Sequence, residues 1–368
     1  MKNVLYISII MLLALITSCD KISPSQEGGD ETSGSYIFFE PEVLEGVEVK
    51  SNENLVTGDK LPDGKPFGVL GYYCIPDSDD ATKTTLVDIF DNPAEANDPL
   101  IEEVYYLSTE NGSSYYKYND LALWKPNINH IFYGFYPYDL VSTVKLNNGE
   151  PYIEYTQPTT MEDMVDILTA NRTLTQATAT NNSVDLTFTH SLWALDFVIK
   201  NSQDNADLIY KDVKISFYGF NKTAEILFTE DKDGKTIKNT TEVTVEENNE
   251  AKDEPNEIAY QYTLYSGDDA TIAAKKSKDF DPILFLPVNG TDCTLKYRLE
   301  VKIKNSRGVY YTYTYPSDTE YQEVKTNFKA GMRYNLTLEK KDPTGNFSVN
   351  WKSVSGWTET TVDDYIFN

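Results

Sequence analysis

The sequence predicts an all-β protein built from two β-sandwich domains in tandem. Three observations support this prediction. Tyr occurs 27 times and, together with Thr, Val, Ile and Phe, gives the chain a composition that favours strands. Short apolar or alternating runs recur at roughly 8- to 12-residue spacing, separated by turn pairs such as Asn-Gly, Asp-Gly and Asn-Asn. The chain of 368 residues is also longer than one hydrophobic core usually serves, which predicts two domains.

The chain begins with a segment typical of export. Lys2 precedes an apolar run from Val4 to Ile16, and small residues then lead to Cys19. This run is shorter than the ~20 residues that span a bilayer, so residues 1–18 are predicted to be a signal peptide. The exit of the run resembles a bacterial lipobox, in which the cysteine thiol receives a diacylglycerol. Cys19 is therefore the predicted lipid-attachment residue; the alternative is an ordinary signal peptide with an incidental cysteine.

The charge balance excludes nucleic acid as a partner. The formal net charge is −26, and it becomes −27 when Lys2 leaves with the signal peptide. Phosphate contacts need clustered Lys and Arg, which this composition does not favour. The same charge repels anionic lipids, so attachment to a lipid bilayer has to come from acyl chains such as palmitate on Cys19. We expect a lipid-anchored protein outside the cell.

The first domain is expected over residues 36–172, after a flexible tether at 19–35 that holds almost nothing to bury. At most one short helix is predicted near its end, over Met161 to Leu168, because Thr160 and Asp163 have capping-box spacing at its start. The predicted strands of this domain are Tyr36 to Phe39, Phe67 to Cys74, Glu103 to Leu107, Ser114 to Tyr118, Ile131 to Tyr136, and Tyr152 to Tyr155.

The second domain is expected over residues 183–368. It follows a predicted linker at 173–182, in which Leu174 is the one large apolar residue. The predicted strands are Val184 to Phe188, Leu195 to Lys200, Val213 to Gly219, Glu225 to Phe228, Glu242 to Val245, Ala259 to Tyr265, Ile283 to Leu286, Thr294 to Ile303, Val309 to Tyr315, Arg333 to Leu338, and Phe347 to Trp351.

The sequence offers little support for catalysis or metal binding. Its two histidines, His130 and His190, flank predicted strands and have no zinc-ligand spacing, and no G-x-S-x-G motif occurs. Asp231 to Lys235 lacks the ligand spacing of a calcium loop and is better interpreted as a hairpin turn. We therefore expect no enzyme activity, no catalytic residue, no metal site and no cofactor.

Two features of the composition leave alternatives open. Cys74 and Cys293 either form a disulfide or remain as buried free thiols. The Trp and Tyr side chains either fill the cores or gather on one exposed face where sugars could stack. That second arrangement would describe a surface glycan-binding lipoprotein that does not polymerise. A glycan-acting hydrolase with two carboxylates is a further alternative, but no particular pair stands out.

Five segments share their order and spacing with one protein family. They are Phe67 to Tyr73; Trp124-Lys125-Pro126 with Ile131 to Pro137; Val165 to Ala170; Leu186 to Leu192; and Phe328 to Leu336 with the downstream Trp351 and Trp357. In this order, and behind a lipobox, they resemble the fimbrillin family of Bacteroidales, the type V pilins and their minor-fimbria-like relatives. The resemblance covers roughly residues 36–360.

The resemblance implies two transthyretin-like β-sandwich domains and export as a surface-exposed lipoprotein of the outer membrane. It implies a structural or adhesive subunit of a fimbria, acting as shaft, tip or anchor. The implied partners are other fimbrial subunits and a host or bacterial surface receptor. In the shaft mechanism of the family, proteolysis removes the first strand, and a strand from a neighbouring subunit fills the opened groove.

On this chain, the resemblance assigns the displaced strand to Tyr36, Ile37, Phe38 and Phe39, with Val43 to Val49 as a candidate extension. The best-known pilins of the family are cut after an arginine, whereas no arginine precedes Arg172 here. Lys50 is the candidate processing residue instead. Alternatively, the strand is never removed, and the lipid permanently attaches an anchor or surface protein to the membrane. Apolar and polar residues alternate from Trp357 to Phe367. This pattern fits either a donor strand or a closing core strand.

Overall fold

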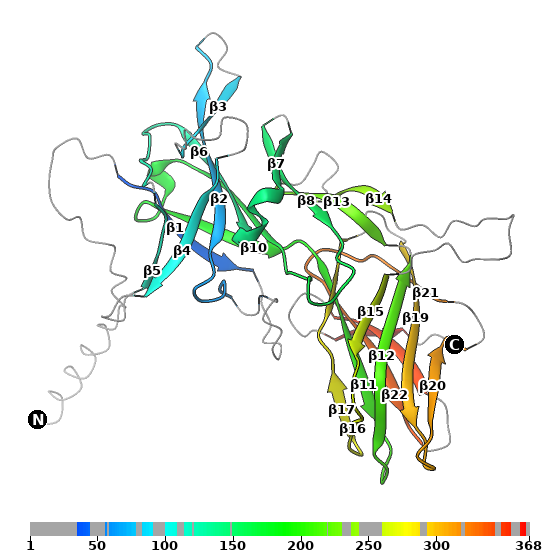
Figure 1. Ribbon diagram of the computed structural model, residues 1–368. Coiled ribbons are helices and arrows are strands. Elements are labelled where there is room, and N and C mark those ends of the chain that lie inside the picture. Colours follow the sequence, from blue (N-terminus) through cyan, green and yellow to red (C-terminus); the bar gives the residue numbers. More distant parts are fainter. Residues whose placement is uncertain are drawn as a thin grey trace, which may run out of the picture.

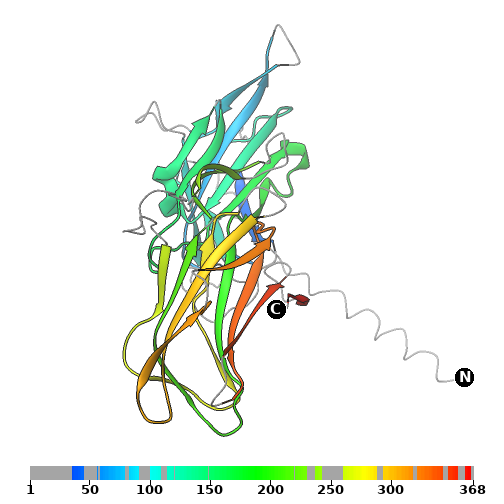
Figure 2. The same cartoon turned by 90° about the vertical axis from the view of Figure 1, so that its right-hand side faces the viewer.

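The computed structural model describes residues 35–44, 56, 59–78, 83–90, 100–108, 114–119, 121–147, 149–218, 220–229, 237–242, 260–287, 293–317, 321–342, 347–354 and 361–365. Over these ranges the chain is almost entirely strand, with two short 3-10 helices, η2 (Tyr138–Thr143) and η3 (Gln176–Thr178). The all-β prediction is confirmed. Figure 1 shows the first sheet at one end of the molecule and the C-terminal sheets at the other, and Figure 2 shows that the molecule is elongated between them.

The first sheet has eight strands. In spatial order they are β1 (Phe38–Val43), β10 (Ser183–His190), β9 (Leu168–Leu174), β6 (Asn129–Tyr136), β2 (Phe67–Pro76), β4 (Glu102–Ser108) and β5 (Ser114–Lys117), and β3 (Thr84–Asp88) pairs with β2 beside this path. Alternate residues of β10, namely Val184, Leu186 and Phe188, are buried in one apolar cluster with Ile37 and Phe39 of the first strand region. This alternation gives the sheet one buried face.

Residues 173–182 do not link two domains, which corrects the prediction. Leu174 ends β9, and β10 returns to the same sheet and pairs with β9. The return is a tight turn in which Asn181 and Asn182 have φ of 53° and 60° and Ser183 N–H donates to the Thr180 carbonyl at 2.8 Å. Asn tolerates this left-handed conformation, so the two residues favour a hairpin-type turn.

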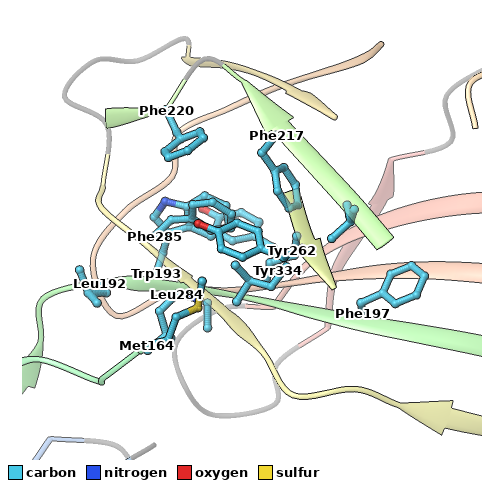
Figure 3. Packing of buried hydrophobic residues seen from close by; sticks show 14 of the residues in the cluster. Met164, Leu192, Trp193, Phe197, Phe217, Phe220, Tyr262, Leu284, Phe285 and Tyr334 are labelled. Carbon is cyan, nitrogen blue, oxygen red and sulfur yellow. The ribbon is translucent and has the colours of Figure 1, made fainter. Parts of the chain in front are cut away.

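The second half of the chain forms two sheets packed around a common core. One runs β17 (Lys276–Asp279), β11 (Trp193–Asn201), β22 (Arg333–Lys340), β23 (Phe347–Val354) and β24 (Thr361–Tyr365), with β18 (Ile283–Phe285) also on β11. The other runs β15 (Tyr260–Tyr265), β12 (Leu208–Tyr218), β19 (Cys293–Lys304) and β20 (Tyr310–Tyr315), with β16 (Ala270–Ile272) on β12 and β21 (Gln322–Thr326) on β19. In this core the Trp193 ring stacks on Phe285, with ring centroids 4.6 Å apart (Figure 3). It also stacks on Phe328, at 4.4 Å.

A four-stranded sheet joins the two halves. Its order is β14 (Ile237–Glu242), β13 (Asn221–Leu227), β8 (Glu150–Thr156) and β7 (Val144–Asn147), so that β8 of the first half pairs with β13 of the second. After β8, Gln157 Nε2 donates to the Leu284 carbonyl at 2.6 Å, and the Leu284 N–H lies 3.4 Å from the sulfur of Met164 (Figure 3). The two halves therefore share one continuous apolar core.

The predicted helix before Leu168 is absent, which corrects the prediction. The capping contact forms, since Thr160 Oγ1 donates to Asp163 Oδ2 at 2.6 Å, but the chain makes a single turn and then extends into β9. Met164 packs into the core of the second half, and the buried Asp166 faces His190 instead. These long-range contacts require side chains on different sides of the segment, which one helix face could not supply.

Candidate functional site

The strand β1 lies parallel to β10 at the end of the first sheet. The register runs from the pair Phe38–Ser183 to the pair Val43–Phe188. At the two ends of this ladder, the Phe38 N–H donates to the Asn182 carbonyl at 3.1 Å and the Leu44 N–H donates to the Phe188 carbonyl at 2.8 Å. Successive backbone N–H groups of a strand point to opposite sides. The N–H groups of the even-numbered residues of β1 therefore point towards β10.

The second edge of β1 is held at two points. The Ile37 N–H donates to the Ala122 carbonyl and the Val43 N–H donates to the Asp59 carbonyl, each at 3.0 Å. Between these two residues, Pro41 occupies a position of the same parity and carries no N–H. Proline is tolerated where the N–H of a strand would face away from the ladder, so this stretch of β1 can remain an edge without losing a bond to β10.

Alternate side chains of β1 and of the residue before it enter the core. Ile37, Phe39 and Val43 are all buried. The Phe39 ring lies 5.5 Å from that of Tyr118 and 5.6 Å from that of Phe132, centroid to centroid, in tilted and edge-to-face arrangements. Any strand that replaced β1 would therefore need apolar side chains at these positions to keep the core filled.

Tyr118 ties the backbone of the first strand region to the neighbouring loop. Its hydroxyl donates to the Ile37 carbonyl at 2.9 Å and accepts from the Ala122 N–H at 3.1 Å. Burial raises the pKa of Tyr118 well above its ordinary value. If the first strand left, this hydroxyl would lose its acceptor in an apolar setting, which makes the empty site costly.

The outward face of β1 is acidic. Glu40 and Glu42 are exposed, and Glu40 is in register with the exposed Asp185 of β10. Thr187 Oγ1 donates to Glu42 Oε1 at 2.8 Å. Like charges on directly opposed residues weaken strand pairing, so the hold of β1 comes mainly from its backbone and its inward side chains.

The chain is fixed again downstream of β1. Val56 is buried, and its N–H donates to Asp166 Oδ2 at 3.1 Å. Asp166 is fully buried and also contacts His190 Nδ1, at 3.1 Å through Oδ1 and 3.0 Å through Oδ2. Thus β1 precedes an anchored residue, with the undescribed residues 45–55 between the two.

The structure gives each predicted site residue a different position. Phe38 and Phe39 open β1, Ile37 is buried just before it, and Tyr36 is 48% exposed and forms an isolated bridge with Leu123. The predicted residues Cys19 and Lys50 lie outside the described residues, as does most of the candidate extension beyond Val43. In the described part of the chain, no helix has the length and apolar character needed to span a membrane.

The sequence did not reveal β10 as the partner of β1. The alternation of Val184, Leu186 and Phe188 predicts a strand, but the linker predicted just before it places this strand in the second domain. The contact between Asp166 and Val56 was also missed. No short-range pattern could have indicated it, because these two residues are distant in the sequence.

The two histidines and Cys74 occupy ordinary structural positions. His130 Nε2 accepts from the Lys125 N–H at 3.2 Å, and burial lowers the pKa of His130. Cys74 is a half-buried free thiol whose pKa is raised by burial, whereas the side chain of Cys293 is not described. Over the described ranges, no group of three or more His, Cys, Asp or Glu side chains is arranged to hold a metal ion.

The described tryptophans lie inside the molecule. Trp124, Trp193 and Trp351 are buried, and Trp357 lies outside the described residues. Three tyrosines, Tyr36, Tyr115 and Tyr311, are among the exposed large apolar side chains, and they lie on different elements. These positions do not form the single aromatic face that sugar stacking requires.

Comparison with known proteins gives one family. A family model described as fimbrillin-like matches residues 56–357. The curated proteins contain no match. Solved structures that align with the chain include candidate cell adhesion proteins from Bacteroides uniformis (16% identity, 88% of this chain and 98% of that chain, TM-score 0.45) and Bacteroides ovatus (17%, 91% and 99%, 0.47). The fimbrial anchor protein Mfa2 from Porphyromonas gingivalis also aligns (8%, 88% and 99%, 0.28).

Proposed function

This chain belongs to the fimbrillin-like family, and from that premise we propose that it is a fimbrial subunit whose first strand can be exchanged for a strand of a neighbouring subunit. The supporting observation is the setting of β1. One short segment fills the core through Ile37, Phe39 and Val43, while its backbone bonds to β10 on one edge and to two carbonyls on the other. Strand addition uses these same two elements, backbone bonds for affinity and alternate side chains for register.

The C-terminal segment supplies a candidate donor. Tyr365-Ile366-Phe367 repeats the tripeptide Tyr36-Ile37-Phe38 that leads into β1. In the single chain, β24 pairs with β23 at the end of its sheet and has no second partner among the described strands. The shared tripeptide includes Ile37, which is buried just before β1, so a segment with this tripeptide is a candidate to occupy a vacated position there. We infer that the donor comes from this segment of a second copy or from a related subunit.

Attachment to the outer membrane through Cys19 is part of the proposal. The tether from Cys19 to Ser35 has 17 residues including both ends, so it reaches at most about 55–60 Å when extended. That reach lets the fold stand clear of a bilayer held by acyl chains. The chain has no arginine before Arg172, so we favour an anchor or surface role in which β1 and the lipid are retained over a shaft role that needs cleavage near Lys50.

A cut-and-exchange experiment tests the strand site. In a soluble full-length chain with Cys19→Ala, residues 45–50 are replaced by the recognition sequence of a site-specific protease, and the chain is cut. We expect the N-terminal fragment to remain bound until an excess of a labelled peptide covering residues 35–44 replaces it, measured by fluorescence anisotropy and intact mass. A peptide covering residues 357–368 should compete.

The matched control is the 35–44 peptide with Ile37→Asp and Phe39→Asp, which keeps the backbone but cannot fill the core. This peptide should fail to exchange. If the cut chain took up neither wild-type peptide, or took up the control equally well, the strand-exchange function would be wrong.

Lipid attachment has its own test. Wild-type chain expressed in a Bacteroidales host should fractionate with the outer membrane and carry a diacylglycerol-modified Cys19 by mass spectrometry, whereas Cys19→Ala should not. A Cys19→Ala protein found in the outer membrane at wild-type level would refute the lipoprotein assignment and leave the strand-exchange result unaffected.

A further inference from the structure

The sheet that contains β12, β19 and β20 carries cations on the face that points away from the core. These three strands lie side by side in the C-terminal half (Figure 1). Alternate residues of β19 are buried in the core, namely Tyr297, Leu299, Val301 and Ile303. The residues between them therefore lie on the outer face of the sheet. With their cationic neighbours on β12 they form what we call the basic face: Lys211, Lys214, Lys296, Arg298, Lys302 and Lys304.

Three ammonium groups gather at one end of the basic face. The register places Lys211 of β12 directly across from Lys302 of β19, and Lys304 follows two residues later. The ammonium nitrogens of Lys211 and Lys304 both lie over the ring of Tyr310 on β20, at 4.2 Å and 5.4 Å from its centroid. Like charges on opposed residues weaken strand pairing. An anion bound between these lysines would relieve their repulsion.

The carboxylates of the chain offset only part of this charge. The ion pairs of the basic face, with their nitrogen-to-oxygen distances, are Lys302–Asp212 (2.8 Å), Lys304–Asp269 (2.9 Å), Arg298–Glu300 (3.3 Å) and Lys296–Glu323 (3.8 Å). Within the described part of the chain, Lys211 and Lys214 form no ion pair. The side chains of the four paired cations are 30–47% exposed. Each of them has several N–H groups, so each can bond to a further anion from solvent.

The cations form a row along β19. Lys296 and Lys304 are eight residues apart, which corresponds to about 27 Å of strand. Glu300 interrupts the row, but Lys214 lies opposite it on β12. On the other side of the row, the exposed Thr312 of β20 is in register with Lys302. A row of this length fits an extended anionic polymer better than a single small anion.

The neutral side chains of the basic face favour a sugar polymer over a protein or a nucleic acid. Protein interfaces are anchored by large apolar side chains, and single-stranded nucleic acids stack their bases on exposed aromatic rings. Val309 and Tyr311 are exposed, but they belong to the opposite side of the sheet, because Tyr311 is in register with the buried Ile303. The neutral residues in register with Lys214, Lys302 and Glu300 are threonines, whose hydroxyls can bond to sugar hydroxyls: Thr263, Thr312 and Thr314.

We propose that the basic face binds an acidic polysaccharide, a sugar polymer that carries carboxylate or sulfate groups. The polymer lies along β19, its anionic groups pair with Lys211, Lys302 and Lys304, and its hydroxyls bond to Thr312. The net charge of −26 does not prevent this, because the Debye length of about 8 Å at physiological salt screens the more distant carboxylates. The site is independent of the exchange of β1 and of lipid on Cys19.

The test measures binding of the uncut full-length chain with Cys19→Ala to immobilised polymers by biolayer interferometry. The polymers are heparin, which is sulfated, polygalacturonate, which is carboxylated, and the neutral polysaccharide dextran. We expect saturable binding to at least one acidic polymer and none to dextran. The affinity should fall as ionic strength rises from about 0.05 M to 0.5 M, because salt screens exposed charges.

Substitutions on the two sheets locate the site. Lys302→Gln should weaken binding about two- to fivefold, as for the loss of one partly exposed ionic contact, and the double variant with Lys211→Gln should weaken it about tenfold or more. The matched control is Lys200→Gln on β11 of the opposite sheet, because Lys200 is also exposed and pairs with the Glu339 carboxylate at 3.2 Å. It should bind normally. Urea midpoints of all three variants should equal that of the parent chain, because the changed side chains lie on the surface.

The probes also identify the anionic group. Binding to heparin alone assigns the site to sulfated polymers, binding to polygalacturonate alone assigns it to carboxylated ones, and binding to both supports acidic polysaccharides in general. Binding to neither would overturn the proposal. Poly-L-glutamate or single-stranded DNA bound as tightly as the better polysaccharide would also overturn it, because the partner would then be a protein segment or a nucleic acid. Equal weakening in Lys200→Gln and Lys302→Gln would mean that binding follows overall charge, and the basic face would not be the site.

Discussion

Two pairs of described strands run parallel, β1–β10 and β11–β22, and they are held in different ways. β11 lies inside its sheet, with β22 on one side and β17 and β18 on the other, and β22 is covered in turn by β23. β1 lies at the end of its sheet and has β10 as its one strand partner. Removal of β11 would break a sheet in two, whereas removal of β1 would expose one edge.

The charged side chains across the two pairs also differ: β11–β22 has an ion pair, whereas β1–β10 has two acidic residues in register. Across β11–β22, Arg333 clasps Asp196 with both guanidinium contacts, Nε to Oδ2 at 3.0 Å and Nη2 to Oδ1 at 2.5 Å. Across β1–β10, Glu40 is in register with Asp185. If β1 is exchanged as we propose, parallel pairing by itself does not hold a strand in place, and the position of the strand in its sheet and the charge across the pair matter as well.

The largest effect is expected from matched ring deletions in the two pairs. Phe39 of β1 and Phe197 of β11 are both buried. Phe39→Ala and Phe197→Ala should therefore each lower the free energy of unfolding of the intact chain by about 3–5 kcal/mol. Urea unfolding measures both. In the chain cut within residues 45–50, only Phe39→Ala should also speed loss of the N-terminal fragment. Equal fragment loss in the two variants would remove the distinction between the pairs.

The next effect concerns the ion pair between Arg333 and Asp196 across β11–β22. Arg333→Ala leaves Asp196 without its guanidinium partner and should destabilise the chain by about 3 kcal/mol at neutral pH. Burial already raises the pKa of Asp196 despite Arg333, and the variant should raise it further. A raised carboxyl pKa gives stability that is present below the ordinary value of about 3.9 and is lost as pH rises through the folded-state value.

Urea midpoints at several pH values check this dependence. The deficit of Arg333→Ala relative to wild type should shrink on acidification towards about pH 4, provided that the wild type stays folded there. Lys200→Ala is the control, because Lys200 is 53% exposed in its pair with Glu339, and it should cost no more than about 0.5 kcal/mol. A pH-independent deficit would mean that Arg333 acts through packing alone.

The sequence was sufficient for the fold class and for the first strand region, and insufficient for the pairings. Alternation through Ile37 and Phe39 predicts a strand with one buried face. That the strand lies parallel to β10 depends on contacts between distant parts of the chain, and no local pattern encodes them. The family resemblance could point to the strand, but not to Tyr118 or Asp59 as the groups that hold it.

The prediction of a helix before Leu168 was wrong for a related reason. Met161, Met164 and Leu168 have helical spacing, and the Thr160 cap is formed. Local propensity is a weak prior, and here Met164 instead enters the core of the second half while Asp166 accepts from Val56. The same segment thus joins the halves of the molecule and anchors the chain after β1, and both tasks need an extended backbone.

A smaller effect is expected from a glycine that supports β10. A Cβ on Gly134 of β6 would lie 2.8 Å from Phe188 Cζ, so Gly134→Ala should force this ring to move and cost about 1–3 kcal/mol. Because Phe188 is in register with Val43, the cut chain should also lose β1 faster. Adding Phe188→Leu should restore part of the stability, measured as a double-mutant cycle. Strict additivity of the two substitutions would mean that this contact is not what the glycine protects.

The smallest effect is expected from the acidic face of β1–β10. Asp185→Lys replaces a like-charge neighbour of Glu40 with an opposite charge, and it should strengthen β1 by about 0.2–1 kcal/mol. In the cut chain this should slow loss of the N-terminal fragment, followed by gel filtration over time. Asp185→Asn should lie between wild type and Asp185→Lys, because it removes the repulsion without adding attraction.

The salt dependence of the Asp185→Lys effect distinguishes a contribution from charge from a contribution from packing. Both carboxylates are exposed, so the difference between Asp185→Lys and wild type should fall as ionic strength rises from about 0.01 M to 1 M, where the Debye length shrinks from about 30 Å to 3 Å. Arg333→Ala should respond far less over the same range, because its pair is largely buried. A difference for Asp185→Lys that persisted in high salt would show that the substitution acts through packing, and that the charge across β1–β10 does not help to make the strand exchangeable.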